Sequence, residues 1–260
     1  MSLSAMSQGA QSVFRLADLI DSRCGTRRVS TVDIGGGLSA NYQSDQVTPT
    51  FSQYASALYE ACGQSATSGR VIITEFGKAL VTKSGAIATL VEDVLHSSQP
   101  RPDGSGPHTT ATAICHAGAD LLLRTAYCPD KFPHRVALLD GRSLAPKLRA
   151  QATESVSQVS FVGPLCFSGD IISSNAKWEA DAEGGGAVPM SAPVVGDVCV
   201  ILDAGANTLS LFSRHCSRSS PAVYAFRRAV AVVNGLNQSR FLISRVREAE
   251  TDQQVLDFWG

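Results

Sequence analysis

Apolar residues recur at helical spacing in two segments near the start of the chain. Across residues 8–22 they form a single stripe on a helix. The residues of this stripe are Ala10, Val13, Phe14, Ala17 and Ile20. A second stripe follows Pro49 and consists of Phe51, Tyr54, Ala55, Leu58 and Tyr59. Both segments are therefore predicted to be amphipathic helices.

Two short apolar segments alternate with these helices and are predicted to be strands. Residues 29–34 are rich in β-branched side chains and stop at Gly35-Gly36-Gly37. Residues 71–73 are continuously apolar, which is typical of a parallel strand buried on both faces. The order helix–strand–helix–strand indicates a piece of an α/β barrel or of a doubly wound sheet.

From about residue 85 the pattern changes to strand-like segments separated by turns. The segments predicted as strands are 87–94, 110–115, 136–139, 156–162, 198–202, 223–233 and 240–245. Asn234-Gly235 predicts a tight hairpin between the last two segments. Residues 97–106 and 181–192 are expected to be exposed loops. The sequence thus predicts an α/β piece over residues 1–84, followed by a β-rich domain over residues 85–260.

Composition and charge exclude several classes of protein. The 260 residues carry a net charge of −1, which provides no basic surface for nucleic acid or for an acidic membrane. No apolar run is long enough to span a bilayer, and the first residues lack a secretory signal. A cytoplasmic protein is expected, or an organellar one with a transit peptide upstream. The seven cysteines are scattered without CxxC spacing, so reduced thiols and no metal site are expected.

Polar clusters follow both N-terminal strands. The first is Gly35-Gly36-Gly37, and the second is Glu75-Phe76-Gly77-Lys78. A right-handed crossover brings the ends of two parallel strands to one edge of the sheet, where α/β proteins have their sites. Consecutive glycines let backbone N–H groups converge on an anion, and a nearby lysine adds positive charge. The pair is interpreted as a phosphate cradle beside a carboxylate; the alternative is a permissive turn beside a salt-bridged carboxylate.

Longer motifs extend these clusters along the chain. They begin with VSTVDIGGGL from residue 29 and EFGKALVTKSGAIATLVEDV from residue 75. They continue with HAGADLLLRTAY, VGPLCFSGD and GDVCVILDAGANTLSLFSRHCSRSSPAVY. In the same order they resemble the diaminopimelate/ornithine group of pyridoxal-phosphate-dependent decarboxylases, which has LDIGGGL and EPGRALVANAGVLLTRVEYV. The resemblance implies that residues 1–84 are the C-terminal part of a pyridoxal-phosphate-binding (β/α)8 barrel, and that residues 85–260 form the family's barrel- or sandwich-like β domain.

The resemblance also implies which residues hold the cofactor. The backbone of residues 35–37 is expected to bind the phosphate of pyridoxal 5′-phosphate, with Gly77 and Lys78 beside it. Lys78 stands where the family has arginine, and Asn207 stands where the family has a tyrosine that contacts the phosphate. Glu75 is expected to face the pyridine nitrogen and keep it protonated, so that the ring accepts the electrons left when CO2 departs.

For the substrate, the resemblance implies Arg124 as the contact of a carboxylate. Cys166 is implied as the thiol that returns a proton at the partner subunit's site; the alternative for Cys166 is a buried structural thiol. Phe167 stands where the family has a carboxylate for the distal amine of the substrate. Asp170, three residues further on, is a candidate to replace that carboxylate.

The family implies a homodimer that releases CO2 from an amino acid, with meso-diaminopimelate to L-lysine, a step of lysine biosynthesis, as the leading reaction. The resemblance begins in mid-barrel, and the family's segment with the Schiff-base lysine has no counterpart in the sequence. The isolated chain is therefore expected to be inactive, as a fragment of the lyase. The alternative is a non-catalytic relative that forms a heterodimer with a full-length decarboxylase and regulates or stabilises it.

Overall fold

The computed structural model of the chain describes residues 2–100, 107–129, 131–147, 156–174, 191–233 and 236–260. Two compact units make up the chain, Met1–Leu211 and Phe212–Gly260. The boundary expected after residue 84 falls inside the first unit and stays a prediction. Within the described residues, no helix is both long enough and apolar enough to cross a membrane.

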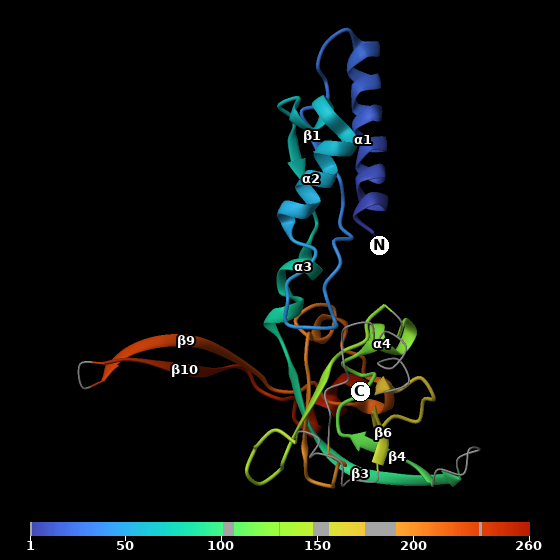
Figure 1. Cartoon of the computed structure of the whole chain (residues 1–260), viewed down its shortest axis with the longest axis vertical. Coiled ribbons are helices and arrows are strands. Elements are labelled where there is room, and N and C mark those ends of the chain that lie inside the picture. Colours follow the sequence, from blue (N-terminus) through green and yellow to red (C-terminus); the bar gives the residue numbers. More distant parts are fainter. Residues whose placement is uncertain (1, 101–106, 130, 148–155, 175–190, 234–235) are drawn as a thin grey trace. The chain divides into compact units, whose positions relative to one another are not determined.

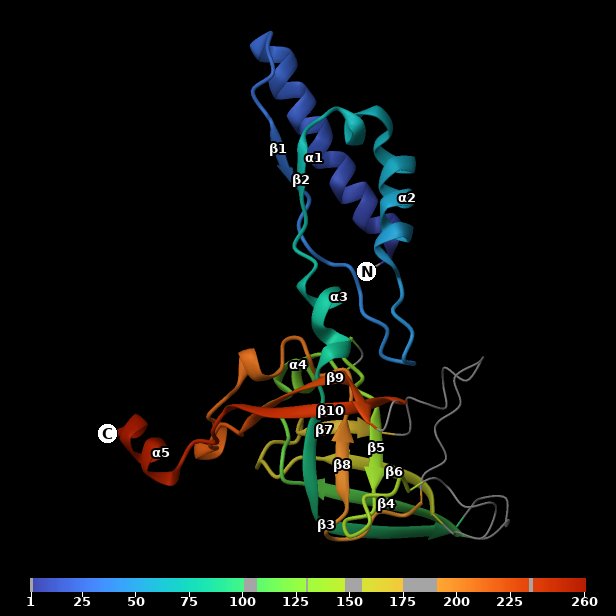
Figure 2. The same cartoon turned by 90° about the vertical axis from the view of Figure 1, so that its left-hand side faces the viewer.

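The first unit begins with the expected α/β piece, whose elements are α1 (Leu3–Cys24), β1 (Thr31–Asp33), α2 (Phe51–Cys62) and β2 (Val71–Ile73). Helix α1 is capped by Ser2, whose side chain accepts from the Ala5 N–H, and it ends at Gly25 with a φ of 65°. Helix α2 begins with a capping box between Thr50 and Gln53. Strands β1 and β2 pair in parallel, with Thr31 opposite Val71 (Figure 2).

The apolar stripes of α1 and α2 face each other. Phe14 of α1 and Tyr54 and Leu58 of α2 are buried in one core with Val32 of β1. This core covers one face of the strand pair and leaves the other uncovered, so Val71 is 61% exposed. The expectation that β2 is buried on both faces is therefore wrong.

After β2 come the short helix α3 (Gly77–Val81) and a six-stranded sheet. The strands are β3 (Ile87–Pro100), β4 (Pro107–Cys115), β5 (Val136–Leu139), β6 (Val156–Val162), β7 (Ile171–Ser174) and β8 (Val198–Ile201), in the order β5-β8-β3-β4-β6-β7. Only β4 and β6 pair in parallel. Helix α4 (Leu123–Tyr127) packs against β7. Among the described residues of this unit, Gly63–Thr67, Thr82–Ser84 and Leu209–Leu211 are further helical turns.

Most strands of this sheet agree with the sequence. Strands β5 and β6 have the predicted bounds, whereas β7, α3 and α4 were not predicted. Residues 97–100, expected in a loop, continue β3, because they pair with β4. Residues 101–106, and residues 181–190 of the other expected loop, lie outside the described part. The sheet has its own core, which includes Val91, Phe161 and Ile201.

The second unit contains a hairpin and a short helix. Strands β9 (Val223–Val233) and β10 (Leu236–Arg247) pair antiparallel (Figure 1), and α5 (Asp252–Trp259) follows them (Figure 2). Residues Val233 and Leu236 lie opposite each other, as the predicted two-residue turn requires, although Asn234 and Gly235 themselves lie outside the described residues. The turn His215–Ser217 precedes the hairpin.

Candidate active site

The two polar clusters of the sequence meet at the carboxyl ends of β1 and β2. The parallel ladder continues beyond both strands: Ile34 N–H donates to the Ile73 carbonyl at 3.0 Å, and Glu75 N–H donates to the Gly35 carbonyl at 3.0 Å. Gly35 and Glu75 are thus direct neighbours. The strands pair in parallel, so both clusters occupy the same edge, as the crossover argument requires.

The glycine segment fits a close approach of backbone to backbone. Gly35 and Gly37 have φ values of 70° and 104°, in the region that favours glycine. A Cβ on Gly36 would lie 2.9 Å from the Glu75 carbonyl oxygen. The Gly35 N–H donates to Oδ1 of Asp33 at 2.8 Å. Among the described residues, the N–H groups of Gly36 and Gly37 have no acceptor, so these two donors can bind an anion.

The second cluster is fixed by an aromatic contact. Phe76 is buried, stacks on Phe51 with ring centroids 5.9 Å apart, and meets the edge of Tyr54 at 5.0 Å. Helix α2 therefore anchors the turn between β2 and α3. Glu75, directly before this anchor, is exposed, and Gly77, directly after it, has open space where a Cβ would be. The Glu75 carboxylate is thus accessible to a ligand beside the glycine segment.

Lys78 and Arg124 converge on one aromatic ring that the sequence did not single out. Lys78 Nζ lies 5.4 Å from the ring centroid of Phe132, and the Arg124 guanidinium carbon lies 5.0 Å from it. Burial lowers the pKa of Lys78, and the neighbouring charge of Arg124 lowers it further. No pattern of spacing signals this cluster, because Phe132 is in a loop far along the chain from Lys78.

The segment around Asn207 packs against the end of α3. Gly205 leaves no room for a Cβ, which would meet the Val81 carbonyl oxygen, and its N–H donates to the Thr82 carbonyl at 3.0 Å. Asn207 has a φ of 57°, which asparagine tolerates better than most residues. The Asn207 segment is therefore attached to the element that carries Lys78.

A buried ion-pair network fixes this attachment. Asp203 accepts from Lys83 Nζ at 2.8 Å and from Arg135 Nε at 2.8 Å. Burial alone would raise the pKa of Asp203, but the two cations outweigh it and hold that pKa below its usual value. Lys83 also donates to the Ser44 carbonyl, and Arg135 contacts Asp45, so the loop after β1 is held by the same charges.

Cys166 and Asp170 lie in one loop between β6 and β7. Cys166 is exposed, so the alternative of a buried thiol does not hold for it. Asp170 is buried, and its carboxylate accepts from the N–H groups of Ala119 at 2.6 Å and Leu165 at 2.8 Å. These bonds give Asp170 a structural role, and its part in substrate binding stays a prediction. Phe167 is exposed, and its ring fills the space where a Cβ of Gly169 would be.

The predicted residues therefore fall into two groups. The first group lies at the ends of β1 and β2 and consists of Gly35–Gly37, Glu75, Gly77 and Lys78. Arg124 belongs to it because Arg124 and Lys78 both lie near the ring of Phe132. The second group is the loop with Cys166 and Asp170. The Asp170 carboxylate holds this loop by accepting from the N–H groups of Ala119 and Leu165. Helix α4, which carries Arg124, packs against β7 directly after this loop. The roles assigned to these residues stay predictions.

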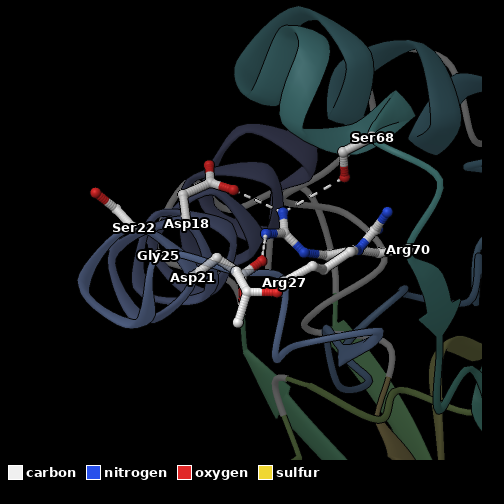
Figure 3. Close-up of a pocket in the computed structure, with 8 residues that line it drawn as sticks. Asp18, Asp21, Ser22, Gly25, Arg27, Ser68 and Arg70 are labelled. Atoms are coloured by element: carbon white, nitrogen blue, oxygen red, sulfur yellow. Dashed lines mark hydrogen bonds and ion pairs between the residues drawn. The ribbon is translucent and has the colours of Figure 1, made fainter.

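A charged depression lies at the opposite, amino-terminal ends of β1 and β2 (Figure 3). The Arg70 side chain is 5% exposed and bonds to Asp18 and Asp21, each at 2.6 Å. The N–H groups of Arg28 and Val29, followed by Arg70, lower the pKa of Asp21 to about 2. Arg70, Asp18 and Asp21 are paired with one another, so these three charges form a clamp between α1 and the start of β2.

A protein family matches the first segment of the chain in sequence, and solved structures match the fold of the chain. Residues 1–82 match the family described as pyridoxal-dependent decarboxylase, pyridoxal binding domain. No curated protein matches the sequence.

Solved structures extend the likeness to the whole chain. Diaminopimelate decarboxylase from Helicobacter pylori, complexed with L-lysine, is 20% identical with a TM-score of 0.62, and the match covers 100% of this chain and 51% of that one. The enzyme from M. jannaschii, in co-complex with L-lysine, is 21% identical with a TM-score of 0.64, covering 98% and 48%. An SrLDC mutant in complex with PLP is 15% identical with a TM-score of 0.53, covering 82% and 46%.

The chain thus spans about half the length of these proteins. Their identities are low enough that the likeness concerns the fold: a partial pyridoxal-binding barrel followed by a β domain. The cofactor of the matching family is pyridoxal phosphate. Residues 1–82 thus resemble the pyridoxal-binding domain of the pyridoxal-dependent decarboxylases, and the chain as a whole has the fold of about half of a diaminopimelate decarboxylase.

Proposed function

We propose that this chain forms part of a pyridoxal-phosphate-dependent amino-acid decarboxylase, with the release of CO2 from meso-diaminopimelate to give L-lysine as its leading reaction. The observation that carries the proposal is the contact between Gly36 and Glu75 at the ends of two parallel strands. It places free backbone donors and an accessible carboxylate side by side, which are the two groups that a phosphorylated pyridine ring needs.

The residues present fit pyridoxal phosphate. The N–H groups of Gly36 and Gly37 are available for the phosphate, and the tight fit at Gly36 excludes a side chain from the cradle. Glu75 is the group that would hold a proton on the pyridine nitrogen. When bound, the cofactor supplies an electron sink for the electrons left by the departing CO2.

Other residues would handle the substrate. Arg124 is exposed and has no ion-pair partner among the described residues, so its guanidinium is available for a carboxylate. Cys166, also exposed, would return a proton to the substrate carbon at a site shared with a partner subunit. The family's dimer, homomeric or formed with a full-length decarboxylase, is part of this proposal, because the chain spans about half of its relatives.

A second candidate is a non-catalytic partner of a full-length decarboxylase. The observation that favours it is Phe167, which is 41% exposed at the position where the family has the carboxylate for the distal amine. An ammonium group that loses water needs a polar partner, and a phenyl ring provides no acceptor.

The first experiment titrates the chain into pyridoxal phosphate and follows the phosphate by ³¹P NMR. The wild type is expected to bind, and Gly36→Val to bind at least tenfold more weakly, because the valine side chain occupies the cradle. Gly9→Val, which alters a glycine with open space around it in α1, is the matched control. Equal binding by wild type and Gly36→Val would contradict the assigned cradle.

The second experiment reduces the mixture with borohydride and locates any pyridoxyl-lysine by mass spectrometry. Lys83 and Lys147 are engaged with Asp203 and Asp197, and none of the five lysines matches the family's Schiff-base motif. No single stoichiometric site is expected. Adding a full-length decarboxylase then separates the two candidates. In the catalytic case Cys166→Ala lowers CO2 release by the mixture, and in the non-catalytic case it leaves CO2 release unchanged.

A further inference from the structure

Lys78 and Arg124 are two cations with unused donors. Within the part of the chain that the structure describes, neither side chain has a hydrogen-bond acceptor or a carboxylate partner. In contrast, the neighbouring cations Lys83 and Arg135 are both paired with Asp203. Two like charges this close repel each other, so something other than a counter-ion must hold them in place.

The ring of Phe132 is the group that both cations share. It lies 5.4 Å from Lys78 Nζ and 5.0 Å from the Arg124 guanidinium carbon, within the range in which a ring face attracts a cation. A partly desolvated setting strengthens this attraction, and Lys78 is half-buried.

The ring itself is held from two sides. The backbone carbonyl of Phe132 accepts from the Thr125 hydroxyl at 3.1 Å, which ties this residue to α4, the helix that carries Arg124. The Tyr42 ring meets it edge-on, with centroids 6.2 Å apart, and Tyr42 also meets His134 edge-on at 5.5 Å. The position of Phe132 is therefore set by the surrounding packing.

We propose that Phe132 is a positioning residue whose ring holds Lys78 and Arg124 near one another as one oxyanion-binding pair. The pair itself stands on this geometry; the identity of its anion, a cofactor phosphate or a substrate carboxylate, rests on the proposed function. A phosphate and a carboxylate offer the same chemistry, since the oxygens of either anion accept hydrogen bonds from an ammonium and a guanidinium.

The test uses the chain labelled with ¹³C at lysine Cε. Only five lysines contribute signals, and the Lys78 signal is identified by its loss in Lys78→Arg. Inorganic phosphate and glycine are titrated separately, so that the two arms distinguish a phosphate from an amino-acid carboxylate. At least one of them is expected to shift the Lys78 signal, and Arg124→Met is expected to weaken that response about tenfold, or about 1.4 kcal/mol.

Variants at Phe132 test the positioning role. Phe132→Leu keeps apolar volume but removes the ring, and we expect about tenfold weaker binding of the same anion; Phe132→Tyr restores the ring and the affinity. Phe212→Leu is the matched control, since it removes another ring near an arginine, Arg214 at 5.8 Å, in the second unit.

A second readout separates positioning from general destabilisation. In the wild-type background Arg124→Met should raise the pKa of Lys78, because the charge of Arg124 lowers it. In the Phe132→Leu background the same substitution should leave that pKa unchanged, because the cations are no longer held together. An equal rise in both backgrounds, or an unshifted Lys78 signal in the wild type with both anions, would overturn the proposal. Because phosphate and glycine replace the cofactor, this outcome is independent of whether pyridoxal phosphate binds.

Discussion

Gly36→Ala tests the contact on which the site depends. A Cβ at this position would lie 2.9 Å from the backbone oxygen of Glu75, closer than real Cβ contacts. The oxygen cannot retreat freely, because the adjoining Glu75 N–H is bonded to the Gly35 carbonyl at 3.0 Å. Overpacking of this kind costs about 1–3 kcal/mol, and the weakened hydrogen bond contributes up to about 1 kcal/mol of that loss.

Gly9→Ala is the opposite case in the same unit. Gly9 is exposed in the interior of α1, and a Cβ there meets nothing within 4 Å. Alanine is favoured over glycine at such a helical position by about 1 kcal/mol. The two variants make the same chemical change, so the sign of the effect depends only on what surrounds each Cβ.

The assay is urea unfolding followed by circular dichroism, with thermal unfolding as a second measure. For a unit of this size about 1 kcal/mol corresponds to about 2–4 °C, so Gly36→Ala should unfold about 2–12 °C below the wild type, and Gly9→Ala a few degrees above it. If Gly36→Ala unfolds at or above the wild-type midpoint, the close approach of the two strand ends is refuted.

Three further predictions concern other parts of the chain. The Asp21 pKa is lowered from 3.8 to about 2, so its native form binds a proton less readily than the unfolded chain. Its contribution to stability is complete above about pH 4 and is lost as the pH falls through 2; Arg70→Met should shrink this loss, measured by urea midpoints between pH 2 and 6. Asp170→Ala leaves one buried and one partly buried N–H donor without their acceptor and should cost about 2–4 kcal/mol in urea unfolding, whereas a loss below about 0.5 kcal/mol would show that the loop does not depend on the carboxylate. Phe167→Glu should raise kcat/KM for diaminopimelate roughly 10- to 100-fold in an enzyme that joins this chain to the N-terminal half of a family decarboxylase, since a bond to a charged group is worth about 1.5–3 kcal/mol; a slower variant would remove Phe167 as the specificity defect.

The strand pair of the α/β piece is covered on one face only. Helices α1 and α2 bury Phe14, Tyr54 and Leu58 against each other and against that face. Val71 and Ile73 of β2, on the face opposite this core, are exposed. A single strand pair still has open edges, which favour self-association.

Local features of the sequence were enough to locate most elements. Helix stripes, caps and β-branched runs act over a few residues, so α1, α2, β2, β5 and β6 were predicted with little error. The sequence also contains a signal for α5, since Thr251 and Gln254 form a capping box at its start. The strand-end rule placed Gly36 and Glu75 at one edge before the structure was known, because parallel pairing alone determines that edge.

Only the tertiary structure decided which distant residues meet. Phe132 has no distinguishing sequence context, yet it joins Lys78 and Arg124, because three separate segments pass the same point in the fold. Asp170 is a substrate candidate by its place three residues after Phe167, and only the fold shows that it accepts from the backbone donors of Ala119 and Leu165. Periodicity and caps depend on neighbours along the chain, but burial and charge pairing depend on neighbours in space, and the path of the chain alone determines those.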